Sequence, residues 1–167
     1  VMDVLEALTG NRVNYGTGTI GGVRRDITPS VEKVIRDMIA FYKNEFGVFY
    51  DVVTDDPIAK ARMRDVGVLT GEDAVTHCAL GPTASGSGLR VDLRWSSPDE
   101  AYCDMDVKPV VPQDYTGEVR GDVFDRFLVR VLEVYQSLEI IENALNGLPT
   151  GDLMWEPKLT KLLSFKK

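Results

Sequence analysis

The feature that most constrains this chain is a long helical pattern between residues 121 and 146. Apolar residues recur there at about 100° per residue, the period of an α-helix, and Gly147 and Pro149 then end the pattern. A helix of this length with one apolar stripe has to bury that stripe against other parts of the chain. The stripe consists of Val123, Phe127, Val131, Val134, Leu138, Ile141 and Leu145.

A second long helix is predicted from residue 28 onward. Thr28 is a suitable N-cap, and Pro29 suits the first helical position because proline has no N–H to leave unpaired there. Helical spacing of the apolar residues that follow predicts a core helix. These residues are Val31, Val34, Ile35, Met38, Phe41, Tyr42 and Phe46.

Shorter elements complete the predicted fold. The period-two alternation of LRVDLRW (89–95) predicts an amphipathic strand, and VNYGTGTIGG (13–22) and DVKPVVP (106–112) are expected to be extended. The fold class is therefore mainly α with a few short β-strands (α+β), in a single domain over residues 1–167. Short helices are expected over 2–8, with Gly10 as C-cap, over 56–64, opened by Asp56 and Pro57, and over 70–80, opened by Thr70 and Asp73.

Composition and charge exclude several function classes. The net charge of −7 disfavours nucleic acid and anionic lipid as partners. No apolar run approaches the roughly 20 residues that cross a bilayer, so we expect no direct membrane insertion. Cys78, Cys103 and His77 are too few for a closed structural zinc site, so we expect free thiols and no bound metal.

The stretch GTIGGVRRDITPS (18–30) is the candidate for a functional loop. Its glycine pair would let backbone amides approach a ligand, and its arginines would clamp an anion or place positive charge beside a redox centre. The residues alone favour a surface turn whose arginines pair with local acids. GPTASGSG (81–88) fits close backbone packing better than a phosphate-binding loop, because it lacks the Lys-Ser/Thr ending of such loops.

Three long segments together resemble one family. They are EALTGNRVNYGTGTIGGVRRDITP, DVGVLTGEDAVTHCALGPTASGSGLRVDLRWSSPDEAY and GDVFDRFLVRVLEVYQSLEIIENALNGLP. The chain is similar to the large subunit of membrane-bound, energy-converting NiFe hydrogenases, which itself resembles the quinone-site 49 kDa subunit of respiratory complex I. The resemblance implies the central helical bundle of that large-subunit fold.

The resemblance also implies that the chain is the middle of a longer subunit. Hydrogenase members hold a Ni–Fe centre with two cysteine pairs near the ends of the subunit, and neither pair is present in this sequence. Complex I members use the equivalent cavity for quinone. The fragment alone is therefore expected to bind no cofactor and to be inactive. It would work at the cytoplasmic face of the membrane with an iron–sulfur small subunit, which carries a cluster, and with other subunits of the complex.

The implied function is electron transfer from the small subunit to proton reduction or H2 oxidation. One alternative is the 49 kDa subunit of an NADH–quinone oxidoreductase, and another is a non-catalytic helical interaction domain. The natural electron partner stays open among protons, quinone, ferredoxin and a nicotinamide-linked (NAD-binding) module.

The resemblance assigns roles to two sets of residues. A cluster-facing loop is expected at Gly21, Gly22, Arg24, Arg25 and Asp26, where many complex I members carry histidine in place of Arg24. Fixed positive charge there would favour the reduced form of the cluster. Ser85 departs from the family, which usually has arginine at that position. A buried ion-pair network around the cavity is expected from Asp92, Arg94, Asp122, Arg126, Arg130 and Glu133.

Overall fold

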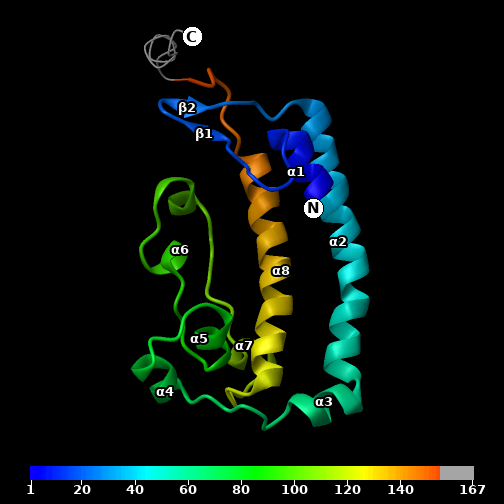
Figure 1. Cartoon of the computed structure of the whole chain (residues 1–167), viewed down its shortest axis with the longest axis vertical. Helices are drawn as coiled ribbons and strands as arrows, with labels where there is room; N and C mark the ends of the chain where they lie inside the picture. Colours follow the sequence, from blue (N-terminus) through cyan, green and yellow to red (C-terminus); the bar gives the residue numbers. More distant parts are fainter. Residues whose placement is uncertain (155–167) are drawn as a thin grey trace. The chain divides into compact units, whose positions relative to one another are not determined.

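The computed structural model describes residues 1–154, apart from the side chain of Val53. The chain divides into two compact units, of which the first contains Val1–Tyr42 with the residues from Leu145 onward and the second contains Lys43–Ala144. Two long helices, α2 (Pro29–Asp55) and α8 (Val123–Asn146), contribute residues to both units (Figure 1). The single-domain assignment stays a prediction.

The first unit contains a short helix, a hairpin and the beginning of α2. Helix α1 (Met2–Thr9) ends at Gly10, as predicted, because its φ of 80° lies in the left-handed region that favours glycine. Strands β1 (Gly18–Thr19) and β2 (Gly22–Val23) pair antiparallel. Gly22 also forms an antiparallel bridge to Met154. The hairpin confirms the extended chain that the sequence predicted here.

Capping contacts confirm the predicted helix starts. Thr28 Oγ1 accepts a hydrogen bond from the Val31 amide at 3.4 Å before the first turn of α2. The Asp56 carboxylate accepts from the Ile58 amide at 2.9 Å and opens α3 (Pro57–Met63). Thr70 accepts from the Asp73 amide and opens α4 (Gly71–Thr76), which ends earlier than the predicted Leu80.

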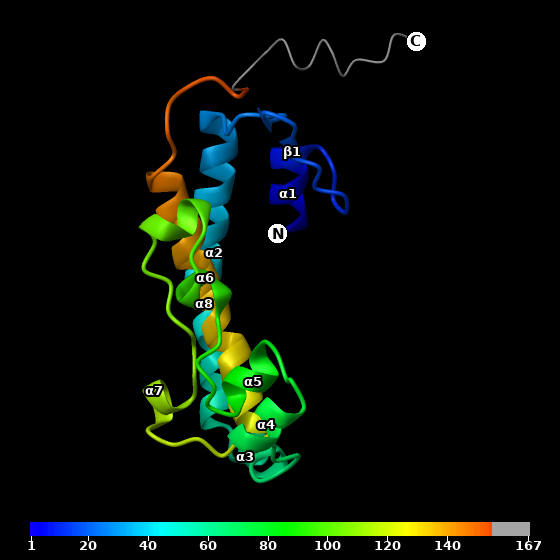
Figure 2. The same cartoon turned by 90° about the vertical axis from the view of Figure 1, so that its left-hand side faces the viewer.

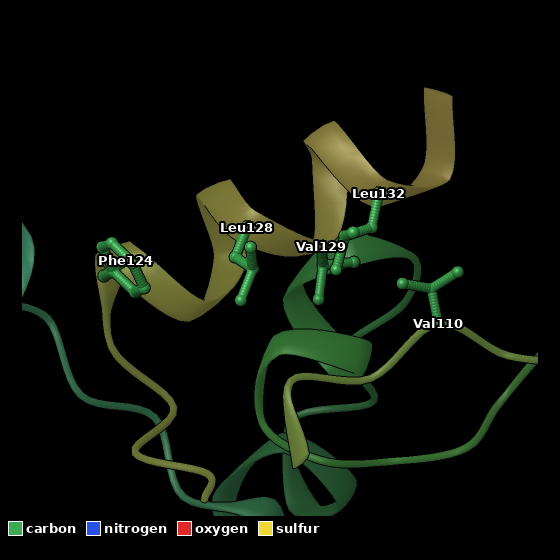
Figure 3. Close-up of a cluster of buried hydrophobic side chains, with 5 residues drawn as sticks. All are labelled: Val110, Phe124, Leu128, Val129 and Leu132. Atoms are coloured by element: carbon green, nitrogen blue, oxygen red, sulfur yellow. The ribbon is translucent and has the colours of Figure 1, made fainter. Parts of the chain in front are cut away.

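Helix α8 is the centre of the second unit. Its side chains Phe124, Leu128, Val129 and Leu132 form an apolar cluster with Val110 (Figure 3). The part of α2 in this unit packs against α8, because the Phe46 and Tyr135 rings lie 5.8 Å apart and Lys43 pairs with Glu142 at 2.6 Å. Helix α5 (Pro82–Gly86) lies beside the first turns of α8 (Figure 2). The remaining elements are α6 (Leu93–Ser96), the 3-10 helix η1 (Glu100–Asp104) and α7 (Gln113–Thr116).

The amphipathic strand predicted over residues 89–95 is wrong. The segment has no strand partner within residues 1–154, and Asp92 instead accepts a hydrogen bond from the Arg94 amide at 2.9 Å and caps α6. An alternating pattern forms a strand only when a neighbouring strand completes its hydrogen bonds. Here the side chain of Asp92 binds a local backbone amide instead, and the segment forms a helix turn.

The predicted core face of α2 is also partly wrong. Ile35 and Ile39 are buried, but Val34 is 39% exposed and Phe41 is 60% exposed. The apolar arc of this helix is therefore wider than the surface that the rest of the described chain covers. On α8 the buried face is wider than predicted, because Phe124 and Leu128 are buried although they lie outside the predicted stripe.

The fold class is confirmed, because long helices dominate the described residues and the strands form one small sheet. No helix within residues 1–154 is long and apolar enough to span a bilayer.

Candidate functional site

The loop predicted to face a redox partner forms the hairpin of the first unit. The chain turns between β1 and β2 at Gly21, whose φ of 87° requires glycine. A groove of about 540 Å³ lies next to β2. It is lined by Leu8, Thr17, Gly22, Val23, Arg25, Asp26, Ile27 and residues 148–153.

The second glycine of the pair is required by packing. The Val23 amide donates to the Leu153 carbonyl at 3.0 Å, so residues 153–154 lie directly along β2. A Cβ at Gly22 would collide with that same carbonyl. Both glycines are thus explained by the turn and by the close approach of two backbones, with no ligand needed to account for them.

The two arginines of the loop are exposed, and each contacts a different part of the first unit. The Arg24 amide donates to the Thr17 carbonyl at 2.9 Å and continues the hairpin. The Arg25 guanidinium lies against Gly10, because a Cβ there would be 2.8 Å from both of its terminal nitrogens. This places a cation at the C-terminal end of α1, where the helix dipole favours positive charge.

The plain surface-turn interpretation expected both arginines to pair with local acids, and the described residues show no such pair. Within residues 1–154, the side chains of Arg24 and Arg25 form no ion pair and no hydrogen bond. The nearby carboxylate of Asp26 instead accepts from the Ile27 amide at 2.8 Å. Within the part of the chain that the structure describes, two positive charges of this loop are thus left without an acidic partner.

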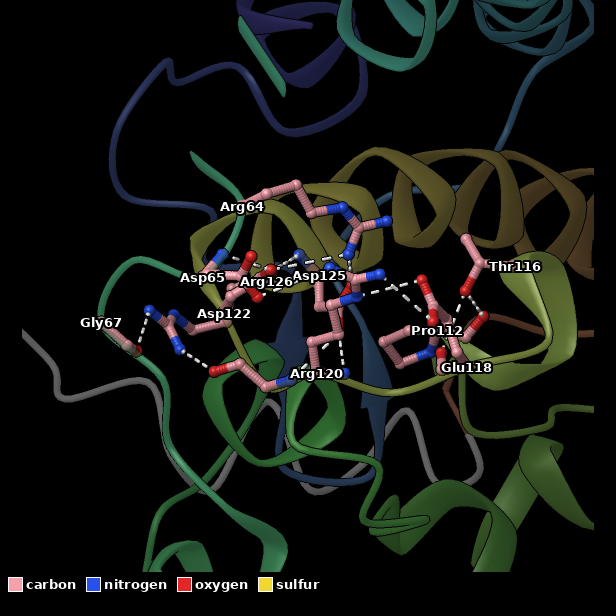
Figure 4. Close-up of polar contacts among 11 residues, drawn as sticks. Arg64, Asp65, Gly67, Pro112, Thr116, Glu118, Arg120, Asp122, Asp125 and Arg126 are labelled. Atoms are coloured by element: carbon pink, nitrogen blue, oxygen red, sulfur yellow. Dashed lines mark hydrogen bonds and ion pairs between the residues drawn. The ribbon is translucent and has the colours of Figure 1, made fainter. Parts of the chain in front are cut away.

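A second charged site surrounds the start of α8 in the second unit (Figure 4). Asp122 and Asp125 are both fully buried. Arg64 Nη1 lies 2.9 Å from Asp125 Oδ1 and 3.5 Å from Asp122 Oδ2, and its guanidinium stacks over the Phe124 ring at 4.0 Å. One partly buried cation thus serves two buried carboxylates.

Backbone amides supply the remaining partners of these carboxylates. Asp122 accepts from the amides of Asp65 at 3.0 Å and Asp125 at 2.9 Å. Asp125 accepts from the amides of Arg120 at 2.7 Å and Gly121 at 3.0 Å. With these bonds, each buried carboxylate has the partners that burial requires.

Arg126 and Arg130 bind backbone rather than carboxylates. Arg126 donates to the carbonyls of Gly121 at 2.7 Å and Gly67 at 2.8 Å. Arg130 donates to the Arg126 carbonyl at 2.9 Å. The site therefore fastens the segments around residues 64–67 and 118–121 to the first turns of α8.

Asp92, Arg94 and Glu133 form a separate group. Arg94 donates to Asp92 at 2.7 and 3.0 Å and to Gln136 of α8 at 3.4 Å. The hydrogen bond from Arg94 lowers the pKa of Asp92, whereas burial raises the pKa of Glu133 against the opposing charges of Arg94 and Arg130. The six predicted network residues thus lie in two clusters, both attached to α8.

Sequence reasoning missed Arg64 and Asp125, which complete the buried cluster. Asp125 carries a usable signal, because it follows Asp122 by three residues at a helix start, where carboxylates bind free amides. Arg64 carries none, since it lies 61 residues from its partner.

The glycine-rich run 81–88 confirms the close-packing prediction. It forms α5 and places Gly86 against α8, where a Cβ would lie 3.0 Å from the Arg126 Cα. Ser85, which replaces the family arginine, is 4% exposed and lies within this packed segment.

The described residues do not fit a Ni–Fe centre. Within residues 1–154, no three His, Cys, Asp or Glu side chains are grouped so that they could hold a metal ion. Cys78 and Cys103 are both free and exposed. No catalytic step is therefore assigned to a metal bound by these residues.

Comparisons with known proteins agree with this architecture. A solved chain in the structure of "the membrane-bound sulfane sulfur reductase (MBS), an archaeal respiratory membrane complex" matches 96% of this chain and 42% of its own, with a TM-score of 0.81 and 33% identity. The fold is thus that of a subunit of a membrane respiratory complex. A family model described as "Respiratory-chain NADH dehydrogenase, 49 Kd subunit" matches residues 1–166, and the chain belongs to this family.

Individual relatives come from both branches that the sequence suggested. The chain is 48% identical to the membrane-bound hydrogenase subunit alpha of Pyrococcus furiosus over 95% of its length and 37% of the relative. It is 35% identical to the fused C/D subunit of the NADH-quinone oxidoreductase of Phocaeicola vulgatus, over 91% of its length and 28% of the relative. The D subunit of the same kind of enzyme from Syntrophobacter fumaroxidans is 36% identical, over 97% of this chain and 42% of the relative. The chain therefore spans less than half the length of these relatives.

Proposed function

We propose that this chain is part of the large subunit of a membrane-bound NiFe hydrogenase. The intact complex would pass electrons from an iron–sulfur small subunit to proton reduction, or in the reverse direction from H2. The observation that carries this proposal is the 48% identity to a hydrogenase alpha subunit, against 35% and 36% for the two NADH-quinone oxidoreductase relatives. An oxidoreductase role in a multi-subunit complex is common to all of them.

The hairpin supports a contact with an electron-carrying partner. Arg24 and Arg25 are exposed and are not neutralised by acids within residues 1–154. A net positive loop beside a cluster would raise its potential, because positive charge stabilises the more negative, reduced form. The proposed role of Arg24 and Arg25 is this electrostatic one, at the cytoplasmic face of the membrane.

The second candidate is the 49 kDa subunit of an NADH–quinone oxidoreductase, with quinone as the bound molecule. It is favoured by the family model itself, which describes that subunit of the respiratory NADH dehydrogenase. The third candidate is a non-catalytic helical interaction domain.

Isolation of the native complex through a tag on this subunit separates the candidates. H2 evolution from a reduced low-potential donor supports the hydrogenase. NADH-dependent quinone reduction assigns the protein to the second candidate, and sulfane sulfur reduction assigns it to the branch of the matching structure. Absence of all three, in a complex whose iron–sulfur clusters are intact, favours the non-catalytic domain. A CxxC pair at each end of the reading frame provides an independent check for the hydrogenase.

A further inference from the structure

Helix α2 has two apolar sides, and the described chain covers only one of them. In the second unit, Phe46 points to α8, where its ring meets Tyr135 at 5.8 Å. Val48 and Val52 lie one turn apart on another side of the helix and are 65% and 56% exposed. Phe49, next to them, is 50% exposed. We call Val48, Phe49 and Val52 the open face of α2.

One residue of the open face, Phe49, also contacts packed aromatic side chains. The Phe49 ring lies 5.6 Å from the Phe46 ring and 6.1 Å from the Phe127 ring of α8, so one side of this side chain is already packed. Phe41, on the same helix one heptad before Val48, is 60% exposed. Large apolar side chains repeated along a helix mark a contact surface, because a helix that is apolar on several sides belongs in the interior of a larger structure.

We propose that, in the complete protein, a further segment of the same large-subunit polypeptide packs on the open face of α2. The argument for this occupant is the length of the related subunits compared with the length of this chain. The chain spans 37% of the hydrogenase alpha subunit and 42% of the sulfane sulfur reductase chain, so most of each relative lies outside the matched part. A segment on the same chain is also present at high effective concentration, which favours it over a separate molecule.

The neighbours of the open face specify the chemistry of the occupant. Glu45, Asp51 and Asp55 of α2 are exposed beside it, and none of them forms an ion pair within residues 1–154. The segment that covers it should therefore carry large apolar side chains with lysine or arginine at its edges. This inference concerns how the subunit is built, so it holds whichever electron acceptor the complex uses.

Hydroxyl-radical footprinting of the complete large subunit, expressed from its full natural reading frame, tests the proposal. Oxidation of Phe49 would be followed by mass spectrometry, with the 2% exposed Phe124 as the buried reference and urea-unfolded protein as the exposed one. We expect Phe49 in the complete subunit, without other subunits, to react at least about fivefold more slowly than in urea, close to Phe124. Val52→Lys should abolish this protection, whereas Val75→Lys, the same substitution at a 64% exposed valine of α4, should preserve it.

Other outcomes overturn the proposal. Protection of Phe49 that appears only when other subunits assemble would assign the open face to a partner subunit. Protection that rises with protein concentration would assign it to a second copy of the chain. A Phe49 that stays reactive in the assembled complex, or a reading frame no longer than this chain, would leave no segment to cover it.

Discussion

Arg64 Nη1 donates a hydrogen bond of 2.9 Å to Asp125 Oδ1, and through it the end of α3 is joined to the first turn of α8. Asp125 is fully buried, and the side chain of Arg64 is 21% exposed. A buried carboxylate is stable only while its partners are present, so the fold of the second unit depends on keeping this pair intact.

Replacing Asp125 with alanine should destabilise the subunit by about 3 kcal/mol, because it leaves two backbone amides without their acceptor and removes the closer of the two carboxylates that Arg64 contacts. Urea denaturation followed by circular dichroism measures the change. Asp114→Ala is the matched control, since the Arg90–Asp114 pair has comparable geometry at the surface and should matter far less. Equal losses in the two variants would refute the structural role of the buried pair.

Two glycine-to-alanine substitutions should change the free energy of unfolding in opposite directions. Gly86→Ala should cost about 1–3 kcal/mol, since its Cβ would press on the Cα and amide of Arg126. Gly47→Ala, within α2 and with open space around its Cβ position, should stabilise by about 1 kcal/mol through helix propensity. Thermal unfolding midpoints distinguish them. A harmless Gly86→Ala would mean that α5 does not pack against α8 as closely as described.

Gly22→Ala should detach residues 153–154 from β2, because the added Cβ would occupy the position of the Leu153 carbonyl. Hydrogen exchange of the Val23 amide, which donates to that carbonyl, should then accelerate. Gly18→Ala adds a Cβ with nothing near it and should leave the exchange of Val23 unchanged. The hairpin pairing is mistaken if both variants behave alike.

Arg24→Met should make the potential of the nearest iron–sulfur cluster more negative in the intact complex, because one uncompensated positive charge is lost. Redox titration followed by electron paramagnetic resonance measures the potential. Arg90→Met removes the same charge from the second unit and serves as the control. An unchanged potential in Arg24→Met would leave the loop with a structural role alone.

The two acids near Arg94 should respond to pH in opposite directions. Burial raises the pKa of Glu133, so ionised Glu133 lowers the free energy of unfolding at neutral pH, where the carboxylate has lost its proton. Glu133→Gln should therefore stabilise the protein at pH 7 but not in acid. The pKa of Asp92 is lowered by Arg94, so its contribution exists above the unfolded pKa and is lost as pH falls through the folded one. Asp92→Asn should therefore destabilise at pH 7 and converge with the unmodified protein in acid. Urea midpoints measured across pH 2–7 test both signs.

Much of this fold could be predicted from local sequence signals. Thr28, Asp56 and Thr70 each bind an amide two or three residues ahead, so the information for a helix start lies within one turn of chain. The apolar period of residues 121–146 likewise depends only on helix geometry. Resemblance over three long segments identified the family, which no single motif would have done.

The sequence by itself determined the two long helices, their starts and the charged residue types on α8. Only the tertiary structure decided which carboxylate meets which cation, because Arg64 and Asp125 come together through folding over 61 residues. It also decided that Asp92 caps a helix turn within residues 89–95, since no neighbouring strand among the described residues completes the hydrogen bonds of this segment. The second glycine of the GGV loop is explained by a carbonyl 131 residues away in sequence, and contacts at that range leave no periodic trace in the sequence.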